Sequence, residues 1–290
     1  MKGGASVFGM PRECGPHWGA FARISAILGM GVLSAGWPAA TLAEEAAGRF
    51  GGLSAGLHAG AARGRSDYGT DPNCAPTSFS VFCTVAPAAS AINGPAVAAS
   101  GSGRTTLRGP IGGAQVGYHR QSGRLVYGGE ADFSVLALDE SATASGTFPS
   151  PFLGNRYSLT NRTAMDWVTT VRGRLGLTVA PEVLLYATGG AAFARVRFSS
   201  TYADNAIGVP FPGGTGSGSA DKVKAGWVVG GGAQWALDRQ WSVKAEYLYA
   251  DLGTVSIDVP LTNTPAYAQT MSASTELSLH LLRIGLDYRF

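Results

Sequence analysis

The chain has 290 residues, of which 42 are glycine, and only 14% of its residues are charged. Glycine is about twice as frequent as in an average globular protein, and charged residues are about half as frequent. Glycine destabilises a helix by roughly 1 kcal/mol per position, so coiled coils and helical bundles are excluded. Because 45% of the residues are hydrophobic, a charge-rich disordered protein is excluded. A net charge of +3 without basic clusters excludes a nucleic-acid-binding surface. What remains is a mostly β chain whose composition is typical of β-barrels in lipid.

The first 43 residues predict a secretory signal peptide. Basic residues, among them Lys2 and Arg23, precede an apolar run over 24–36, and Thr41 and Ala43 supply the small residues of a cleavage site. The apolar run is about 13 residues long, which is shorter than the roughly 20 that a spanning helix needs. We therefore expect cleavage after Ala43, with residues 44–290 forming the barrel domain. A short N-terminal core helix is the alternative.

Eight segments with strand-like patterns follow the signal peptide. They cover residues 50–63, 110–121, 124–138, 164–180, 183–198, 224–236, 241–256 and 276–290. Each exceeds the roughly 9–11 residues that cross a membrane at a 45° tilt, so the strands should project beyond the lipid on one side. In lipid every backbone polar group must be paired, and only a closed sheet has no unpaired edge. The sequence therefore predicts an all-β fold, an eight-stranded antiparallel transmembrane β-barrel.

The last segment shows the alternation of a barrel strand most clearly. One set of alternate residues is mostly apolar and ends in aromatic side chains, and it comprises Ser278, His280, Leu282, Ile284, Leu286, Tyr288 and Phe290. The other set carries the charges, and it comprises Leu279, Leu281, Arg283, Gly285, Asp287 and Arg289. The segments 124–138, 164–180 and 241–256 repeat this pattern, which predicts apolar side chains toward lipid and charged ones toward the lumen. A soluble sandwich or lipocalin-like barrel, the alternative, would reverse the two faces.

The segment 183–198 has two competing frames. Placing Arg195 and Arg197 in the lumen turns Tyr186, Val196 and Phe198 toward lipid. This frame agrees with the apolar-out pattern of the other segments.

The connections between the segments alternate in length without exception. Those at 122–123, 181–182 and 237–240 are short and rich in turn residues, whereas those at 66–109, 139–163, 199–223 and 257–275 are long. Compact soluble domains seldom contain several loops of this length, but outer-membrane barrels have short periplasmic turns and long extracellular loops. We expect that arrangement here, with both chain termini in the periplasm.

Five strand motifs resemble one protein family. They are MDWVTTVRGRLG at 165–176, LYATGGAAF at 185–193, GWVVGGG at 226–232, KAEYLYADLG at 244–253 and RIGLDYRF at 283–290. Together they resemble the porin-family, Omp25/Omp31-like surface antigens of alphaproteobacterial outer membranes. The resemblance implies an eight-stranded barrel, a location in the Gram-negative outer membrane and a role in envelope integrity. It also implies that Tyr288 and Phe290 form the signal read by the outer-membrane assembly machinery.

The inward face should hold a charge network of four acids and five bases. Its expected members are Glu130, Asp132, Arg172, Arg174, Lys244, Glu246, Arg283, Asp287 and Arg289. An eight-stranded barrel has an interior just wide enough for its side chains, and charges buried there must be paired. We expect this network to be a structural plug. A narrow ion path lined by the same charges is the functional alternative.

Two cysteines lie in the long first loop. Cys74 and Cys83 are nine positions apart, and an extracellular loop is in an oxidising environment, so a disulfide between them is predicted. The three histidines beyond the signal peptide lie on separate segments without the spacing of metal ligands, and no metal or cofactor is expected. Ser278 and His280 share a face, but a serine nucleophile also needs a group that orients its base, and none is identifiable nearby.

These observations predict a non-enzymatic, structural outer-membrane barrel that contributes to envelope integrity and presents surface loops. A small pore for ions or solutes and a haem-binding surface protein are the alternatives, and an enzyme acting on lipid A is a third. The expected partners are outer-membrane lipid, the assembly machinery and a host or environmental ligand at the loops. Nucleic acid is not among them.

Overall fold

The computed structural model describes residues 48–73, 87–149, 154–205, 213–262 and 268–290. The described residues belong to one compact unit, and the expected signal peptide, residues 1–43, lies outside them. Cys74 and Cys83 also lie outside the described residues.

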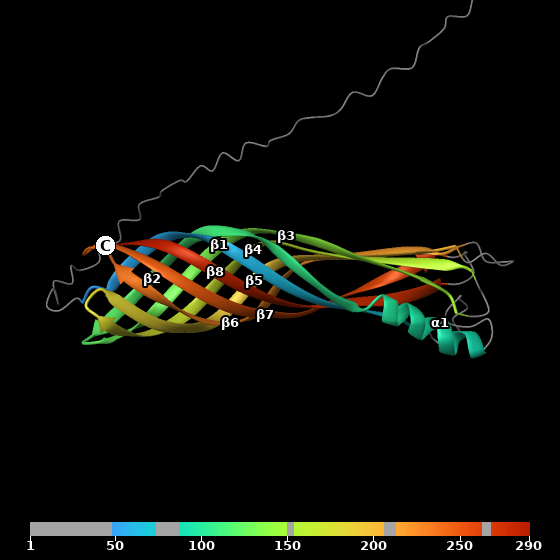
Figure 1. Ribbon diagram of the computed structural model, residues 1–290, viewed down its shortest axis with the longest axis horizontal. Coiled ribbons are helices and arrows are strands. Elements are labelled where there is room, and N and C mark those ends of the chain that lie inside the picture. Colours follow the sequence, from blue (N-terminus) through green and yellow to red (C-terminus); the bar gives the residue numbers. More distant parts are fainter. Residues whose placement is uncertain (1–47, 74–86, 150–153, 206–212, 263–267) are drawn as a thin grey trace, which may run out of the picture. The chain divides into compact units, whose positions relative to one another are not determined.

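Eight antiparallel strands form a closed barrel, in which each strand pairs with its sequence neighbours and the first pairs with the last (Figure 1). The strands are β1 (Gly52–Pro72), β2 (Gly103–Ser122), β3 (Leu125–Thr147), β4 (Arg156–Ala180), β5 (Val183–Asp204), β6 (Thr215–Ala236), β7 (Trp241–Thr262) and β8 (Ala268–Arg289). This confirms the predicted eight-stranded antiparallel barrel. The described part of the chain contains no helix long and apolar enough to cross a membrane.

The barrel has two halves of opposite polarity. We call the half that holds both described chain ends, Gly48 and Phe290, the terminal half, and the other, which ends beside the helix α1 (Pro87–Ser100), the distal half (Figure 1). Along β8 the outward side chains are apolar or aromatic from Phe290 to Leu282 and polar from His280 onward. The inward side chains of β8 reverse this order, from Arg289 and Asp287 to Leu279, Leu277 and Met271.

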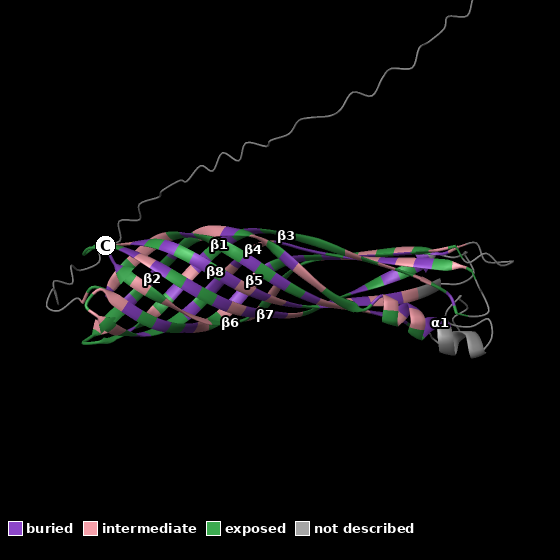
Figure 2. Ribbon diagram, in the orientation of Figure 1, coloured by how far each residue is buried: buried purple, intermediate pink, exposed green. Residues whose placement is uncertain are grey.

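The distal half therefore has a core like that of a soluble protein. Its interior is lined by buried apolar side chains from the strands, among them Leu107, Leu138, Phe198, Ile257 and Leu277. Buried and exposed residues alternate along the strands in both halves (Figure 2). Each fully buried large apolar side chain contributes roughly 1.5–3 kcal/mol, so the distal half carries a stabilising core of its own. The expectation of an apolar outside and a charged inside is correct for the terminal half only.

A β-bulge lets β7 follow this change of polarity. The inward residues of β7 have even numbers up to Leu252 and odd numbers from Val255 onward. The pairing with β8 shifts register between Asp251 and Gly253, and Gly253 has φ of +66°, which a residue with a Cβ rarely adopts. One extra residue at this point turns Val255, Ile257 and the apolar residues after them into the core.

The strands are longer, and most long loops shorter, than the sequence predicted. The strands have between 20 and 25 residues and extend farther at the distal end than expected. The remaining distal connections are 73–102, 148–155, 205–214 and 263–267. The predicted boundaries were wrong because the distal strand ends carry Ser, Thr, Gly and Ala outside, which gives no apolar alternation although the ladder continues.

The first distal connection contains the helix α1, which the sequence analysis did not predict. Val97 of this helix is buried in the same apolar cluster as Phe148 and Tyr157. The Tyr157 hydroxyl donates to the Ala96 carbonyl, and the Thr70 hydroxyl donates to the Gly101 carbonyl. The helix is thereby anchored to the distal end of the barrel.

The predicted frame of β5 is wrong. Arg195 and Arg197 are exposed on the outside, and Tyr186, Val196 and Phe198 are buried inside. The two arginines belong to the distal half, where charged residues face outward and pair with Asp221 and Asp166 respectively.

Candidate functional site

Eight charged side chains meet inside the terminal half, in what we call the lumen cluster. They are Glu130 and Asp132 of β3, Arg172 and Arg174 of β4, Lys244 and Glu246 of β7, and Arg283 and Asp287 of β8. None is more than 6% exposed. Four acids face four bases, so the formal charge of the cluster is zero, as buried charges require.

Arg172 is the centre of the lumen cluster. Its Nη2 donates to Glu130 Oε1 at 2.7 Å and to Asp132 Oδ2 at 3.0 Å, and its Nη1 donates to Glu246 Oε1 at 2.8 Å. The planar guanidinium suits this task, because its fork of N–H donors can engage several carboxylates at once. One arginine of β4 thus connects β3 with β7 across the lumen.

Two further cations complete the ion pairs. Arg283 donates to Asp132 Oδ1 at 3.0 Å and also to Glu246 Oε2. Lys244 Nζ donates to Glu130 Oε1 at 2.8 Å and lies 3.8 Å from Asp287 Oδ2. Each acid therefore has at least one cation within ion-pair distance.

Arg174 has a different environment from the other cations. Its Nη2 donates to Gln234 Oε1 at 2.5 Å, and its nearest carboxylate, Glu130, is 3.5 Å away. Its guanidinium carbon lies 3.5 Å from the centre of the Tyr186 ring, a cation–π distance, and the Tyr186 hydroxyl donates to Glu246. Tyr186 is thus part of the cluster instead of facing lipid.

Neutral polar side chains extend the cluster to the remaining strands. Gln115 of β2 donates to Asp287 at 2.5 Å and lies 3.1 Å from His58 Nδ1 on β1. The other ring nitrogen of His58 lies 2.8 Å from the Ser134 hydroxyl. With Tyr186 of β5 and Gln234 of β6, all eight strands contribute to the cluster and its polar shell.

The sequence analysis missed these neutral members, although a signal for Tyr186 was present. Directly opposite residues of an antiparallel pair share a face of the sheet. Arg174 pairs with Thr188 across the two-residue turn at 181–182, and Gly176 pairs with Tyr186. Counting across that turn from the inward arginines would have placed Tyr186 in the lumen.

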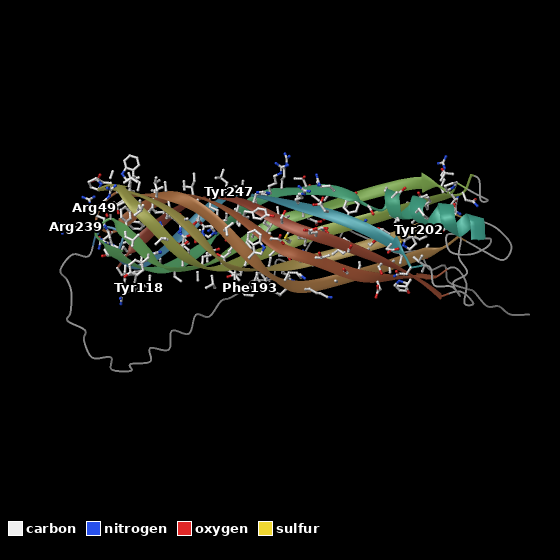
Figure 3. The ribbon with its side chains drawn as sticks, turned by 90° about the horizontal axis from the view of Figure 1, so that it is seen from below. Arg49, Tyr118, Phe193, Tyr202, Arg239 and Tyr247 are labelled. Carbon is white, nitrogen blue, oxygen red and sulfur yellow. The ribbon has the colours of Figure 1, made fainter. Side chains whose placement is uncertain are left out.

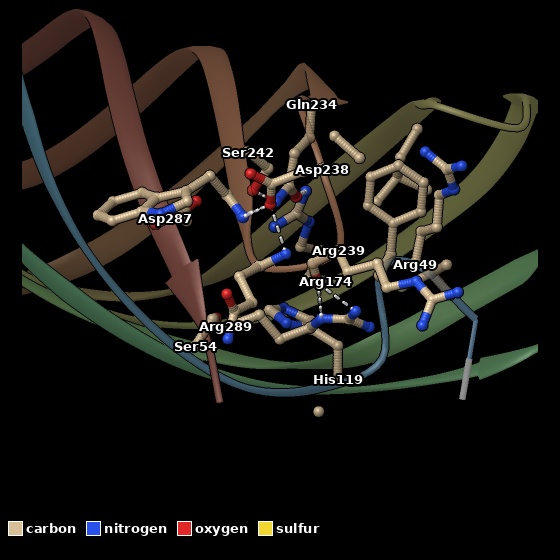
Figure 4. A pocket seen from close by; sticks show the side chains of 17 residues that line it. Arg49, Ser54, His119, Arg174, Gln234, Asp238, Arg239, Ser242, Asp287 and Arg289 are labelled. Atoms are coloured by element: carbon tan, nitrogen blue, oxygen red, sulfur yellow. Dashed lines mark hydrogen bonds between the residues drawn. The ribbon is translucent and has the colours of Figure 1, made fainter. Parts of the chain in front are cut away.

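Arg289 was expected in the charge network, but it lies outside the lumen cluster. It lines a small cavity of about 20 Å³ at the terminal mouth of the barrel, together with Arg49, His119 and Arg239 (Figure 4). Its guanidinium donates to the backbone carbonyls of Gly48, Gly51 and Arg239, and no described carboxylate lies within 4 Å of it. At the last position of β8 these carbonyls are nearer than any acid, so Arg289 fastens the chain ends to the turn at 237–240.

The lumen is filled along the described strands. Arg283, Lys244 and Leu248 are among the largest side chains that are almost fully buried. The apolar core of the distal half follows directly after the lumen cluster along the barrel, from Leu281 to Leu277 on β8. The cavity at the terminal mouth has room for about one or two water molecules.

The outer surface of the terminal half is a continuous apolar belt with aromatic residues at both edges. Near the chain ends lie Tyr118, Trp235, Trp241, Tyr288 and Phe290, and nearer the middle lie Phe133, Trp167, Phe193, Trp227, Tyr247 and Tyr249. Figure 3 shows Tyr118 near Arg49 and Arg239, Phe193 and Tyr247 farther along the barrel, and Tyr202 near its distal end. The nine residues of β8 in the belt rise roughly 20 Å at a 45° tilt, close to the apolar band of a membrane barrel.

Tyr288 and Phe290 lie on the outside of the belt at the end of β8. Their rings are in edge contact at 5.1 Å between centroids, and Tyr288 also contacts Trp241 at 5.0 Å. Phe290 is 74% exposed. Both side chains are thus accessible to lipid or to a partner protein.

The three described histidines occupy separate environments. His58 and His119 are buried in the lumen, whereas His280 is on the outside and its Nδ1 lies 2.6 Å from the Tyr247 hydroxyl. Among the described residues no group of His, Cys, Asp and Glu is arranged to hold a metal. The partner of His280 is therefore Tyr247 and not Ser278.

A closed antiparallel sheet with a lipid-compatible belt, aromatic edges and a neutral charged interior defines an integral membrane β-barrel. The chain belongs to the outer membrane protein β-barrel domain family, whose model matches residues 26–290.

Named relatives agree with this assignment. The chain is 33% identical over 192 residues to the 31 kDa outer-membrane immunogenic protein of Brucella melitensis, a match that covers 66% of this chain and 70% of the relative. It is 27% identical over 143 residues to the 22 kDa outer membrane protein of Rhizobium leguminosarum bv. viciae, covering 49% and 53% of the two chains. The resemblance to alphaproteobacterial surface proteins is thereby confirmed. Among solved structures, the outer membrane protein OprG of Pseudomonas aeruginosa matches with 9% identity and a TM-score of 0.43, covering 84% of this chain and 99% of that one.

Proposed function

We propose that this barrel is a structural protein of the outer membrane that supports the envelope and presents surface loops as an antigen. The observation that carries the proposal is the change of polarity at the middle of the barrel. The fourteen residues of β8 beyond the belt, 268–281, rise roughly 30 Å at a 45° tilt, with a polar outside and a packed apolar inside. Such a stalk would hold the distal loops above the lipid at a fixed position. The immunogenic relative in Brucella melitensis also supports a surface role.

The proposed orientation places the distal half outside the cell and both termini in the periplasm. The connections at the terminal end have two to four residues, as periplasmic turns do, and the long first connection is at the distal end. Single cysteines in place of Asp204 and Glu182, each combined with Cys74→Ser and Cys83→Ser, test the orientation in intact cells. The Asp204→Cys variant should react with a membrane-impermeant maleimide and Glu182→Cys should not. The opposite labelling pattern would reverse the orientation.

The proposed assembly route involves a cleaved leader and two aromatic residues at the end of β8. Residues 1–43 would be removed as a signal peptide, and Tyr288 and Phe290 would be recognised by the outer-membrane assembly machinery. N-terminal sequencing of the mature protein should begin at Glu44. The Phe290→Ala variant should accumulate less heat-modifiable barrel in the outer membrane than Phe133→Ala, a matched loss of one lipid-facing aromatic ring. Equal amounts of folded barrel in the two variants would remove Phe290 from this role.

The filled lumen supports a closed barrel that neither conducts ions nor catalyses a reaction. The lumen cluster and the distal core stand one after the other along the lumen. His58 and Ser134 lie at hydrogen-bond distance, as a base and a nucleophile would, but both are buried where no substrate reaches them. Planar-bilayer recordings of the refolded protein should show no steady conductance. A reproducible ion-selective conductance would replace this proposal by a pore, and a Soret shift on haem titration would support a haem-binding role.

A further inference from the structure

A row of basic side chains, two arginines and a histidine, lies directly beyond the apolar belt on three neighbouring strands. Arg63 of β1 pairs with Arg108 of β2 on one side and with His280 of β8 on the other. One step toward the chain ends, Ala61 pairs with Pro110 and Leu282, which are the last outward residues of the belt on these strands. The two arginines and the histidine are therefore in register with one another and with the edge of the belt.

Arg63 and Arg108 have no acidic partner, unlike Arg65, Arg104, Arg162, Arg195 and Arg197 of the distal half. Among the described residues no carboxylate lies within 4 Å of the guanidinium of Arg63 or Arg108, and their side chains are exposed. Farther along the same strands, Arg65 and Arg104 share Asp67, at 2.7 Å and 2.6 Å. On the opposite side Arg195 pairs with Asp221 at 2.5 Å. Arg63 and Arg108 are thus two directly opposed arginines that the acids of β1 and β2 leave without a partner.

Like charges directly opposite each other across a β-ladder repel one another. The Cβ atoms of such a pair are only about 4.5–5.5 Å apart, and the repulsion grows where the dielectric falls beside lipid. Ordinary cross-strand pairing would place an acid opposite Arg63, and instead an arginine lies on one side and a histidine on the other. An anion bound between them would remove this repulsion.

We infer that Arg63, Arg108 and His280 bind the phosphate of a phosphorylated lipid in the outer leaflet. The inference rests on the proposed orientation, which places the edge of the belt at the headgroups of that leaflet. Arginine forks bind phosphate oxygens with two parallel hydrogen bonds. The acyl chains would lie along Ala61, Pro110 and Leu282 below the row. The Tyr247 hydroxyl lies at hydrogen-bond distance from His280 Nδ1. The other ring nitrogen, Nε2, has no partner among the described residues and can donate to the phosphate.

The position at the belt edge distinguishes a lipid from a soluble phosphate. A soluble anion needs only the basic side chains, whereas a lipid phosphate also needs apolar surface directly beside them for its acyl chains. The three side chains lie at the edge of the belt. On no other outward row of β1 are both cross-strand neighbours basic residues. The shape of the surface therefore favours an amphiphile.

The test uses the full-length mature barrel, refolded in detergent, and measures binding of a diphosphorylated lipid A and of the same lipid without phosphates. The Arg63→Gln/Arg108→Gln variant should bind the phosphorylated lipid at least tenfold more weakly, which is about 1.4 kcal/mol. The Arg195→Gln/Arg197→Gln variant is the matched control, because it removes two outward arginines that already have acidic partners. It should change binding less than twofold. The dephosphorylated lipid should bind all forms equally weakly.

Three results would overturn the inference: equal loss in both variants, no loss in the first, or full displacement of the lipid by millimolar inorganic phosphate. Heat-modifiability on a gel verifies that each variant is folded. If the double variant does not refold, His280→Gln keeps both arginines and should weaken binding about threefold, and unchanged binding would again overturn the inference. Failure of the orientation is recognised separately, since the cysteine at position 204 would then not be labelled from outside.

Discussion

Replacing Arg172 by methionine tests whether the lumen cluster stabilises the barrel. Arg172 is 3% exposed and donates to Glu130, Asp132 and Glu246. Methionine keeps much of the length of the side chain but leaves four buried acids facing three bases. Removing one partner of a buried ion pair costs about 3–5 kcal/mol, so the free energy of unfolding should fall by about that amount.

The assay is a urea titration of the refolded barrel in lipid vesicles, followed by tryptophan fluorescence and by the gel shift of the folded form. The matched control is Arg195→Met, which removes one arginine that pairs with Asp221 on the outside. The side chain of Arg195 is 45% exposed, and an exposed ion pair contributes about 0–1 kcal/mol. The two variants differ in burial of the same chemical group.

A second change separates the ion pairs from packing. Glu246→Gln combined with Arg172→Met restores the balance of acids and bases, so the double variant should be less destabilised than the sum of the single variants by about 0.5–3 kcal/mol. A loss below about 1 kcal/mol for Arg172→Met, no larger than that for Arg195→Met, would refute the argument that the buried charges hold the strands together.

Three further predictions concern the turns and the distal half. The backbone amides of Trp241 and Gln240 donate to the Asp238 carboxylate and lower its pKa. The ionised Asp238 therefore stabilises the folded barrel fully above the ordinary pKa of about 3.9, and this stabilisation is lost as the pH falls through the lower pKa of the folded state. Asp238→Asn should therefore be less stable than the natural protein in urea at pH 7, and an equal deficit at about pH 3 would contradict this. Gly253→Ala should lower the free energy of unfolding by about 1–2 kcal/mol in the same titration, because Gly253 has φ of +66°. Gly129→Ala should lower it less, because a Cβ has ordinary room at that position. Equal losses of stability in the two variants would contradict the role of the bulge. Leu277→Ala should cost about 2–5 kcal/mol by calorimetry, as in the core of a soluble protein, and a loss no larger than that for the lipid-facing Leu282→Ala would argue against a packed distal core.

The barrel itself was predictable because lipid imposes a simple rule on the outward face. Once a membrane is assumed, the alternation from Leu282 to Phe290 on β8 determines which residues face lipid. The short turns then determine the number of strands. The charged cluster was accessible for the same reason, since Arg172 and Glu246 lie on faces opposite apolar residues. These patterns are local and need no knowledge of the neighbouring strands.

The distal half was not predictable from the same rule. Beyond His280 water replaces lipid outside, so apolar residues turn inward and Arg197 turns outward with no change in the strand. The bulge at Gly253 also shifts the count by one residue. The helix α1 was missed because its segment is rich in Ala, Ser, Pro and Gly, and it is held through tertiary contacts such as those of Val97.

The seam between β1 and β8 has a consequence for how the protein reaches its final state. Arg283 of β8 reaches Asp132 of β3 only when β8 has paired with β1 and the sheet has closed. A sheet that is still open would expose these groups to hydrocarbon, where unpaired charges are strongly disfavoured. The polar interior therefore penalises every partly inserted intermediate, and favours a single concerted step in which insertion and closure of the seam occur together.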